Sequence, residues 1–209
     1  MIRNILLDMG GVVTLQDADE ARRRFADLGI DSGKLVHSYG QTGVFGAFEA
    51  GEIDEEDFCA ELSRMAGREI SLQEAAHCCL GFKKEAPIDR LHYLLELKQK
   101  YHLCLVSNTN PFVINDHCTS NFSSDGRPIS DYFHSLLLSY KLKVCKPDKE
   151  FFIRALAADN MKAEECVFID DSLTNIQSAE AVGIHGKHRY TNEPWREKLE
   201  KILSSENHA

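Results

Sequence analysis

The sequence lacks three features that would each indicate a distinct class of protein. It has no C-x-x-C pair, no run of Lys and Arg longer than the three arginines at 22–24, and no apolar stretch near the roughly 20 residues that a membrane-spanning helix needs. The missing cysteine pairs argue against a zinc ribbon or a thioredoxin-like motif. Without a basic cluster we expect no nucleic-acid partner, and without a long apolar run we expect no membrane span.

The composition fits an acidic globular protein with a substantial core. The chain has 209 residues, is 43% hydrophobic and carries a formal net charge of -9. This length fits one large domain, or a core with a modest insert. An acidic balance suits a protein that binds small molecules, although it says nothing about the fold.

The cysteines and the N-terminal residues predict where in the cell the protein is found. The seven cysteines are odd in number, and Cys104 and Cys166 stand inside apolar runs, where we interpret them as small hydrophobic residues. Free thiols are typical of a reducing compartment. Because Asp8 interrupts the first apolar run after a few residues, we expect no signal peptide and a cytoplasmic location.

Short apolar runs alternate with helical patterns along most of the chain. Runs that end in polar residues, as buried parallel strands do, lie at 5–7, 103–106 and 166–169, and further strands are expected at 135–138 and around 183–185. Apolar residues recur at helical spacing over 87–101, 148–159, 174–182 and 194–203. The alternation predicts an α/β fold with a parallel sheet.

Residues 16–84 break this rhythm and show only helical patterns. We expect helices over 18–28, 34–39, 54–65 and 71–78, the last opened by a capping box formed by Ser71 and Glu74. A helical insert just after the first strand would lie over the end of the sheet as a lid. The predicted division is an α/β core of residues 1–15 and 85–209, with a helical cap of residues 16–84.

Asp8 stands at the C-terminal tip of the first predicted strand, where open α/β sheets bind their ligands. A carboxylate there can attack phosphorus or ligate Mg²⁺, although a lone strand-end aspartate more often caps a turn. Gly10 and Gly11 permit a tight turn that brings the backbone close to a ligand.

Two further pieces follow in the order that a phosphoryl-transfer site needs. Ser107 and Asn108 end the second predicted strand, and a hydroxyl with exposed N–H groups at such a junction either binds phosphate oxygens or caps a helix. Lys146, just before Pro147, would supply positive charge to a phosphoryl group and to Asp8, or would be an ordinary surface lysine.

Asp170 and Asp171 end the third predicted strand. Adjacent carboxylates repel each other, which favours a Mg²⁺ ion shared with Asp8 over the alternative of a solvated acidic turn. Asn175 would orient these carboxylates by hydrogen bonds. Since every piece lies at a strand end or just beyond it, we interpret them as one site.

These segments resemble the four motifs of the haloacid dehalogenase-like hydrolase superfamily. The motifs are Asp-x-Gly-Gly-Val from Asp8, Ser-Asn-Thr-Asn from Ser107, Lys146-Pro147, and Asp-Asp-Ser-x-x-Asn-Ile from Asp170. The last motif and residues 48–53 are most similar to the branch of bacterial sugar-1-phosphate phosphatases and the phosphatase domain of epoxide hydrolases. The resemblance covers nearly the whole chain. It implies a doubly wound, Rossmann-like parallel-sheet core with a small all-helical cap after the first strand.

The implied activity is a Mg²⁺-dependent phosphatase that acts on a small phosphorylated metabolite such as a hexose 1-phosphate. By position, the resemblance makes Asp8 the nucleophile and a Mg²⁺ ligand. The carbonyl of Gly10 would be the second ligand and Asp171 the third, with Asp170 close by or acting through water. Ser107 and Asn108 would hold the phosphate, and Lys146 would bridge the phosphate and the nucleophile.

One departure from the family pattern concerns Gly10. Most phosphatases of the superfamily have a second aspartate at this position, which protonates the leaving group and then activates water. A general acid or base is worth about 10²–10⁴ in rate. The sugar-1-phosphatase branch tolerates this change, and an anomeric oxygen leaves more easily than an ordinary alcohol. We therefore expect either reduced activity or a substrate that needs little help from an acid.

The cap leaves the substrate open. Phe45, Phe48 and Glu49 would face a sugar, or the two phenylalanines would pack the cap's own core. The alternative functions are a non-catalytic phosphate-binding module, a 2-haloacid dehalogenase and a phosphomutase. Dehalogenases use no metal, so the paired aspartates argue against one, and a phosphomutase needs the acid that Gly10 lacks. The expected partner is a small phosphorylated molecule, with a monomer and a homodimer both open.

Overall fold

A five-stranded parallel sheet forms the centre of the computed structural model, which describes residues 1–31 and 43–206. The strands are β1 (Asn4–Leu7), β2 (His102–Ser107), β3 (Ser135–Leu138), β4 (Cys166–Asp170) and β5 (His185–His188). Their order in the sheet is β3-β2-β1-β4-β5. Asn4 pairs with His102 on one side and Cys166 on the other, so β1 is the central strand. The α/β fold class is confirmed.

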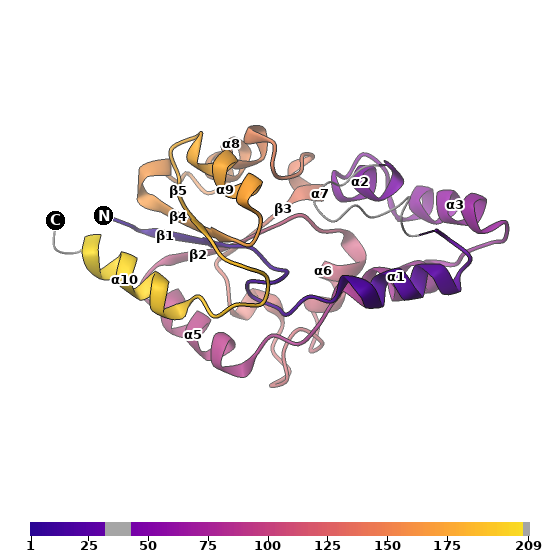
Figure 1. Cartoon of the computed structure of the whole chain (residues 1–209), viewed down its shortest axis with the longest axis horizontal. Coiled ribbons are helices and arrows are strands. Elements are labelled where there is room, and N and C mark those ends of the chain that lie inside the picture. The colour runs from indigo at the N-terminus through magenta and orange to yellow at the C-terminus, as the bar shows by residue number, and fades with distance from the viewer. Residues whose placement is uncertain (32–42, 207–209) are drawn as a thin grey trace.

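Helices cover both faces of the sheet (Figure 1). The longer ones that follow β1 in the core are α5 (Ile88–Lys98), α8 (Lys149–Ala158), α9 (Leu173–Glu180) and α10 (Arg196–Glu206), and two shorter ones are α6 (Pro111–His117) and α7 (Ser139–Leu142). Figure 1 shows α8 and α9 on one side of the sheet and α5 and α10 on the other. Single 3-10 turns lie at Leu80–Phe82, Ile129–Asp131 and Ala163–Glu165.

Alternation along the strands divides the core in two. Ile5 and Leu7 belong to the larger apolar cluster, which includes Leu91 of α5 and Leu199 of α10. Leu6 points the other way and belongs to the second cluster, with Phe152 of α8 and Ile176 of α9. Because the side-chain period of a strand is two, a strand buried on both faces carries consecutive apolar residues, as β1 does from Ile5 to Leu7.

Among the described residues, five α-helices separate β1 from β2: α1 (Ala18–Asp27), α2 (Gly43–Glu49), α3 (Glu55–Ala66), α4 (Leu72–Cys79) and α5. Ser71 caps α4 in the expected capping box with Glu74. Among the described residues between β1 and β2 there is no further strand, and the helix expected over 34–39 lies outside the described residues. Figure 1 places α1, α2 and α3 beyond one end of the sheet, on the side of α6 and α7.

Other boundaries differ modestly from the predictions. β5 begins at His185 rather than near 183, and α6 was not among the expected helices. Asn110 caps α6 by accepting a hydrogen bond from the Val113 N–H at 3.3 Å. Within the described ranges, no helix is both long and apolar enough to cross a membrane.

Candidate active site

The candidate site lies where three strands end. Asp8 directly follows β1, Ser107 is the last residue of β2, and Asp170 is the last residue of β4. Because the strands are parallel and adjacent, their C-terminal ends meet at one edge of the sheet. The connections to β2 and β4 leave β1 in opposite directions, which creates the crevice in which α/β sheets bind ligands.

Lys146 is at the centre of this edge. Its ammonium lies 2.6 Å from Asp8 Oδ1 and 2.8 Å from Asp170 Oδ2, and it donates a third hydrogen bond to the Val106 carbonyl at 3.0 Å. The residue is only 3% exposed. The alternative of an ordinary surface lysine is therefore wrong, and the structure joins Lys146 to Asp8 as the sequence analysis expected.

The three aspartates of this site lie close enough together to shift one another's pKa values. Burial and the repulsion of Asp170 and Asp171 raise the pKa of Asp8 to about 7, against the attraction of Lys146. The pKa of Asp171 is raised too, mainly by burial. Burial alone would lower the pKa of Lys146, but Asp170 and Asp8 more than offset that effect and raise it. One buried cation thus faces three carboxylates, and the site favours a further positive charge.

Asp170 and Asp171 have different surroundings. Asp170 is fully buried, and its oxygens accept hydrogen bonds from Lys146, from the Ser172 N–H at 2.7 Å and from the Asn175 amide at 3.1 Å. Asp171 lines the pocket described below, where its Oδ2 accepts from the Thr191 hydroxyl at 2.6 Å. Asp170 is therefore held beneath the site, whereas Asp171 faces the space where a ligand would lie.

The turn after Asp8 is tight for identifiable reasons. Gly11 has φ +79°, and a Cβ there would lie 2.5 Å from Asp171 Oδ2, so both the backbone and the close approach of Asp171 require glycine. The next carbonyl, that of Val12, accepts hydrogen bonds from the Arg90 guanidinium at 2.6 Å and the Trp195 indole at 2.8 Å. These bonds fix the backbone behind Asp8.

Ser107 and Asn108 lie at the site, but their side chains have different roles. Ser107 lines the pocket with its hydroxyl 3.1 Å from the Asn108 carbonyl. The Asn108 amide pairs reciprocally with the backbone of Lys146: its Nδ2 donates to the carbonyl and its Oδ1 accepts from the N–H, each at 2.8 Å. The Asn108 side chain therefore positions the backbone of Lys146.

A pocket of about 380 Å³ opens beside Asp8 and Lys146. It is also lined by two polar side chains that the sequence analysis did not identify, Thr109 and His117. Within residues 1–31 and 43–206, Thr109 Oγ1 and His117 Nδ1 are buried without a hydrogen-bond partner. Burial and the nearby Lys83 lower the pKa of His117 to about 4, so its imidazole is neutral near pH 7. Thr109 belongs to the Ser-Asn-Thr-Asn motif, but the motif gave its side chain no role, and no motif marks His117, which α6 brings to the pocket.

The aromatic residues expected to contact a substrate mostly form core. Phe48 is fully buried, does not line the pocket, and stacks on Phe58 with ring centroids 4.3 Å apart. Phe45 packs against Phe25 and Phe82 but also lines the pocket, as does Glu49, which is 6% exposed. Of the three, only Phe45 and Glu49 are placed to meet a ligand.

Gln16 is the residue nearest to the position where the family pattern has an acid. A Cβ built on Gly10 would lie 3.2 Å from Gln16 Cδ and 3.4 Å from its Nε2. Gln16 is exposed and lines the pocket, and its backbone pairs with Asn192. Its amide therefore occupies the space beside Gly10. The sequence offered no signal for this contact, since Gln16 belongs to no motif.

Comparisons with known proteins agree with this geometry. The family model of haloacid dehalogenase-like hydrolases matches residues 2–183. The chain is 37% identical over 206 residues to a D-ribitol-5-phosphate phosphatase of Bacteroides thetaiotaomicron, covering 98% of this chain and 100% of that protein. Among solved structures, a HAD-like family hydrolase of Porphyromonas gingivalis has a TM-score of 0.91 at 33% identity, covering 97% and 98% of the two chains. A wild-type HAD family enzyme of B. thetaiotaomicron, in complex with magnesium and inorganic phosphate, has a TM-score of 0.82 at 28% identity, covering 95% and 99%.

Proposed function

The chain belongs to the haloacid dehalogenase-like hydrolases and is a Mg²⁺-using phosphatase of that family, and we propose that its substrate is a small phosphorylated polyol or sugar. One observation carries the assignment of the site: Lys146 is buried between Asp8 and Asp170 beside a pocket that Asp8 and Lys146 both line. A phosphate ester bound there meets a carboxylate nucleophile and a fixed positive charge together.

The donor set fits Mg²⁺. Asp8, Asp170 and Asp171 offer carboxylate oxygens within 4.8 Å of one another, and Mg²⁺ prefers such hard oxygen ligands. We assign Asp8, Asp171 and the carbonyl of Gly10 as ligands, with Asp170 supporting them from beneath through Lys146 and Asn175. When bound, Mg²⁺ would offset negative charge on the transferring phosphoryl group.

Asp8 is the proposed nucleophile. Its Oδ1 accepts the hydrogen bond from Lys146, which leaves Oδ2 to attack phosphorus. A bond forms between Asp8 and phosphorus as the bond from phosphorus to the substrate oxygen breaks, giving an aspartyl-phosphate. Lys146 and the Ser107 hydroxyl stabilise the charge on the phosphoryl oxygens, with the Asn108 side chain positioning Lys146. Water then attacks the aspartyl-phosphate, which releases inorganic phosphate and restores the Asp8 carboxylate.

The leaving oxygen must gain a proton that Gly10 cannot donate. The amide of Gln16 lies beside Gly10, and an amide donates a hydrogen bond without transferring its proton. We propose that Gln16 stabilises the leaving oxygen while water supplies the proton. This arrangement predicts strong dependence of the rate on how easily the alcohol leaves.

The pocket suits a hydroxylated substrate. Thr109 Oγ1 and His117 Nδ1 are buried polar atoms that gain a hydrogen bond if a substrate hydroxyl reaches them. A relative that is 37% identical is named for D-ribitol 5-phosphate, and hexose 1-phosphates carry the same combination of a phosphate and several hydroxyls. The two classes differ in the leaving oxygen, which is a primary alcohol in ribitol 5-phosphate and an anomeric oxygen in a hexose 1-phosphate.

We also propose that residues 16–84 act as a cap on the core formed by 1–15 and 85–209. Phe45 and Glu49 of α2 line the pocket from the cap. Glu49 would contact the organic part of the substrate, because a carboxylate and a phosphate repel each other. Closure of the cap would exclude bulk water before attack.

Phosphate release tests the function. Wild type and Asp8→Asn would be assayed against ribitol 5-phosphate and hexose 1-phosphates, with Mg²⁺ and with a chelator. We expect Mg²⁺-dependent release that Asp8→Asn abolishes. No release from any compound, with inorganic phosphate still bound, would instead identify a non-catalytic phosphate-binding module. Preference for hexose 1-phosphates would indicate that leaving-group ability dominates, and preference for ribitol 5-phosphate that hydroxyl contacts dominate.

The state of the cysteines bears on where in the cell the protein is found. All seven cysteines are free, as in proteins of a reducing compartment, and we propose that the protein is cytoplasmic. Cell fractionation tests this. Size-exclusion chromatography with light scattering distinguishes the monomer from the homodimer.

A further inference from the structure

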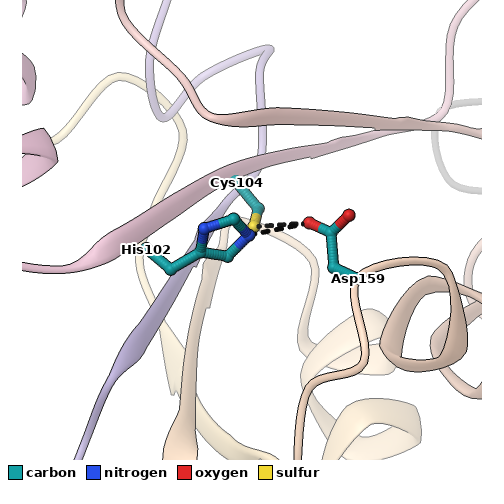
Figure 2. Close-up of side chains that lie close together, drawn as sticks. All are labelled: His102, Cys104 and Asp159. Atoms are coloured by element: carbon teal, nitrogen blue, oxygen red, sulfur yellow. Dashed lines mark hydrogen bonds and ion pairs between the residues drawn. The ribbon is translucent and has the colours of Figure 1, made fainter.

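A second cluster of metal-ligand side chains lies at the opposite end of β2 from the active site. His102 and Cys104 are alternate residues of β2, so both side chains lie on the sheet face that α8 covers, and Asp159 directly follows α8. Figure 2 shows the imidazole and the thiol directed at the same carboxylate. His102 Nε2 lies 2.8 Å and Cys104 Sγ 3.5 Å from Asp159 Oδ2.

Imidazole nitrogen, cysteine sulfur and carboxylate oxygen are the three donor types of protein zinc sites. The three ligand atoms here lie within 4.8 Å of one another. We propose that His102, Cys104 and Asp159 bind a thiophilic divalent ion such as Zn²⁺. On binding, the thiol proton is released to solvent and the imidazole carries its proton on Nδ1. The charges of the thiolate and the carboxylate then balance that of the ion.

The two separations to Asp159 need little adjustment. Zinc–ligand bonds of about 2.0–2.3 Å in a tetrahedron place the ligand atoms about 3.3–3.8 Å apart. The separation of 3.5 Å between Cys104 and Asp159 already lies in this range, and that of 2.8 Å between His102 and Asp159 must widen by about half an ångström. The His102 side chain is 36% exposed, which gives an ion access from solvent. The fourth ligand is water or Met161, whose sulfur lies 3.9 Å from Cys104 Sγ.

A nucleophilic cysteine and a structural tie are the two other roles open to this cluster. A nucleophilic cysteine would need a thiolate with the imidazole placed as its base, but burial and then Asp159 raise the pKa of Cys104, and His102 bonds to Asp159. A purely structural tie between β2 and α8 uses the same hydrogen bonds and predicts no uptake of an ion. Only the zinc site predicts a bond between metal and sulfur.

Ligand chemistry separates this site from the active site. Asp8, Asp170 and Asp171 offer only oxygen and lie at the C-terminal ends of the strands, whereas His102 is the first residue of β2. Oxygen ligands favour Mg²⁺, and sulfur with imidazole favours Zn²⁺. Excess Mg²⁺ can therefore occupy the first site while the second is titrated.

Cobalt(II) binding tests the proposal, with full-length protein stripped by a chelator and then held in excess Mg²⁺. A thiolate ligand gives a sulfur-to-cobalt charge-transfer absorption in the near ultraviolet, which a site made only of oxygen lacks. We expect the absorption to saturate at one Co²⁺ per chain, to be displaced by Zn²⁺ and to vanish in Cys104→Ser. Asp159→Asn should weaken Co²⁺ binding at least about tenfold.

The chain offers a matched control. Cys166 is also buried on this face of the sheet, but its sulfur lies near the Lys162 carbonyl and the Asn4 amide. Cys166→Ser should keep the absorption. The proposal is overturned if wild type gives no charge-transfer band, if Cys104→Ser keeps it, or if Cys166→Ser loses it equally. Should circular dichroism show that Cys104→Ser fails to fold, His102→Ala removes a partly exposed ligand and must weaken the band in its place.

Discussion

Gly10→Asp is expected to make the rate less dependent on the leaving group. Gly10, unlike Gly11, does not have a positive φ, so an aspartate can adopt its backbone conformation. A Cβ there would lie 3.2 Å from Gln16 Cδ, and Gln16 is exposed and flexible enough to withdraw by a few tenths of an ångström. The new carboxyl would then lie beside the leaving oxygen and could donate its proton.

The size of the gain follows from two opposed effects. A general acid is worth about 10²–10⁴ in rate. Displacing Gln16 loses its proposed hydrogen bond to the leaving oxygen, worth about 1 kcal/mol, or roughly fivefold. We therefore expect kcat/KM for ribitol 5-phosphate to rise about 20- to 2,000-fold, with little change for p-nitrophenyl phosphate, whose leaving group needs no proton.

Steady-state kinetics on the two esters provide the assay, and Gly10→Asn is the matched control because it has the same size without an acidic proton. The ratio of kcat/KM for the alkyl ester to that for the aryl ester should rise in Gly10→Asp alone. Equal ratios in Gly10→Asp and Gly10→Asn would refute the reasoning, since proton supply would then not limit the reaction.

Three further predictions concern Asp8, Lys146 and Thr109. The pKa of Asp8 is raised from 3.8 to about 7 in the folded protein. Between these two pH values, Asp8 is therefore protonated in the metal-free native state and ionised in the unfolded chain. The free energy of unfolding should therefore fall as pH rises from about 4 to 7. Urea unfolding in the presence of a chelator should show this fall in wild type and not in Asp8→Asn. If the free energy of unfolding depends on pH equally in both proteins, the expectation is wrong. Lys146→Met leaves the buried Asp8 and Asp170 unpaired and should lower the free energy of unfolding at neutral pH by about 3–5 kcal/mol, less in acid, whereas an unchanged urea midpoint would count against it. Thr109→Val removes an unpartnered buried hydroxyl, so stability should hold while KM for a polyol phosphate rises about fivefold; a lower melting temperature with unchanged KM would show that the hydroxyl is structural.

The catalytic edge of the sheet was predictable because burial and topology act locally on β1, β2 and β4. Each of these strands is an apolar run that ends in polar residues, so their parallel pairing brings Asp8, Ser107 and Asp170 together. β5 was placed early because its sequence, His-Gly-Lys-His, has no apolar run. Only one of its four residues is buried, so its sequence carries a weaker signal than that of β3, the other edge strand, which is Ser-Leu-Leu-Leu.

Side-chain direction was less predictable than position. Asn108 was expected to hold phosphate, but its amide reaches the backbone of Lys146, which is distant in sequence. Phe48 was a candidate for substrate contact, but its partner Phe58 belongs to another helix. Such choices depend on tertiary neighbours, and neither periodicity nor motif spacing encodes those neighbours directly.

The bonds to the Val12 carbonyl have a consequence for how the enzyme is made. The strand that carries the nucleophile is synthesised early, yet both of its neighbours in the sheet come much later, starting at His102 and Cys166. The Trp195 indole, which secures the turn behind Asp8, is 183 residues beyond the Val12 carbonyl that it binds. Contacts between such distant residues form slowly and late. During translation the nucleophile is therefore unsupported until Trp195 has left the ribosome, and the nascent chain should show no phosphatase activity before that point.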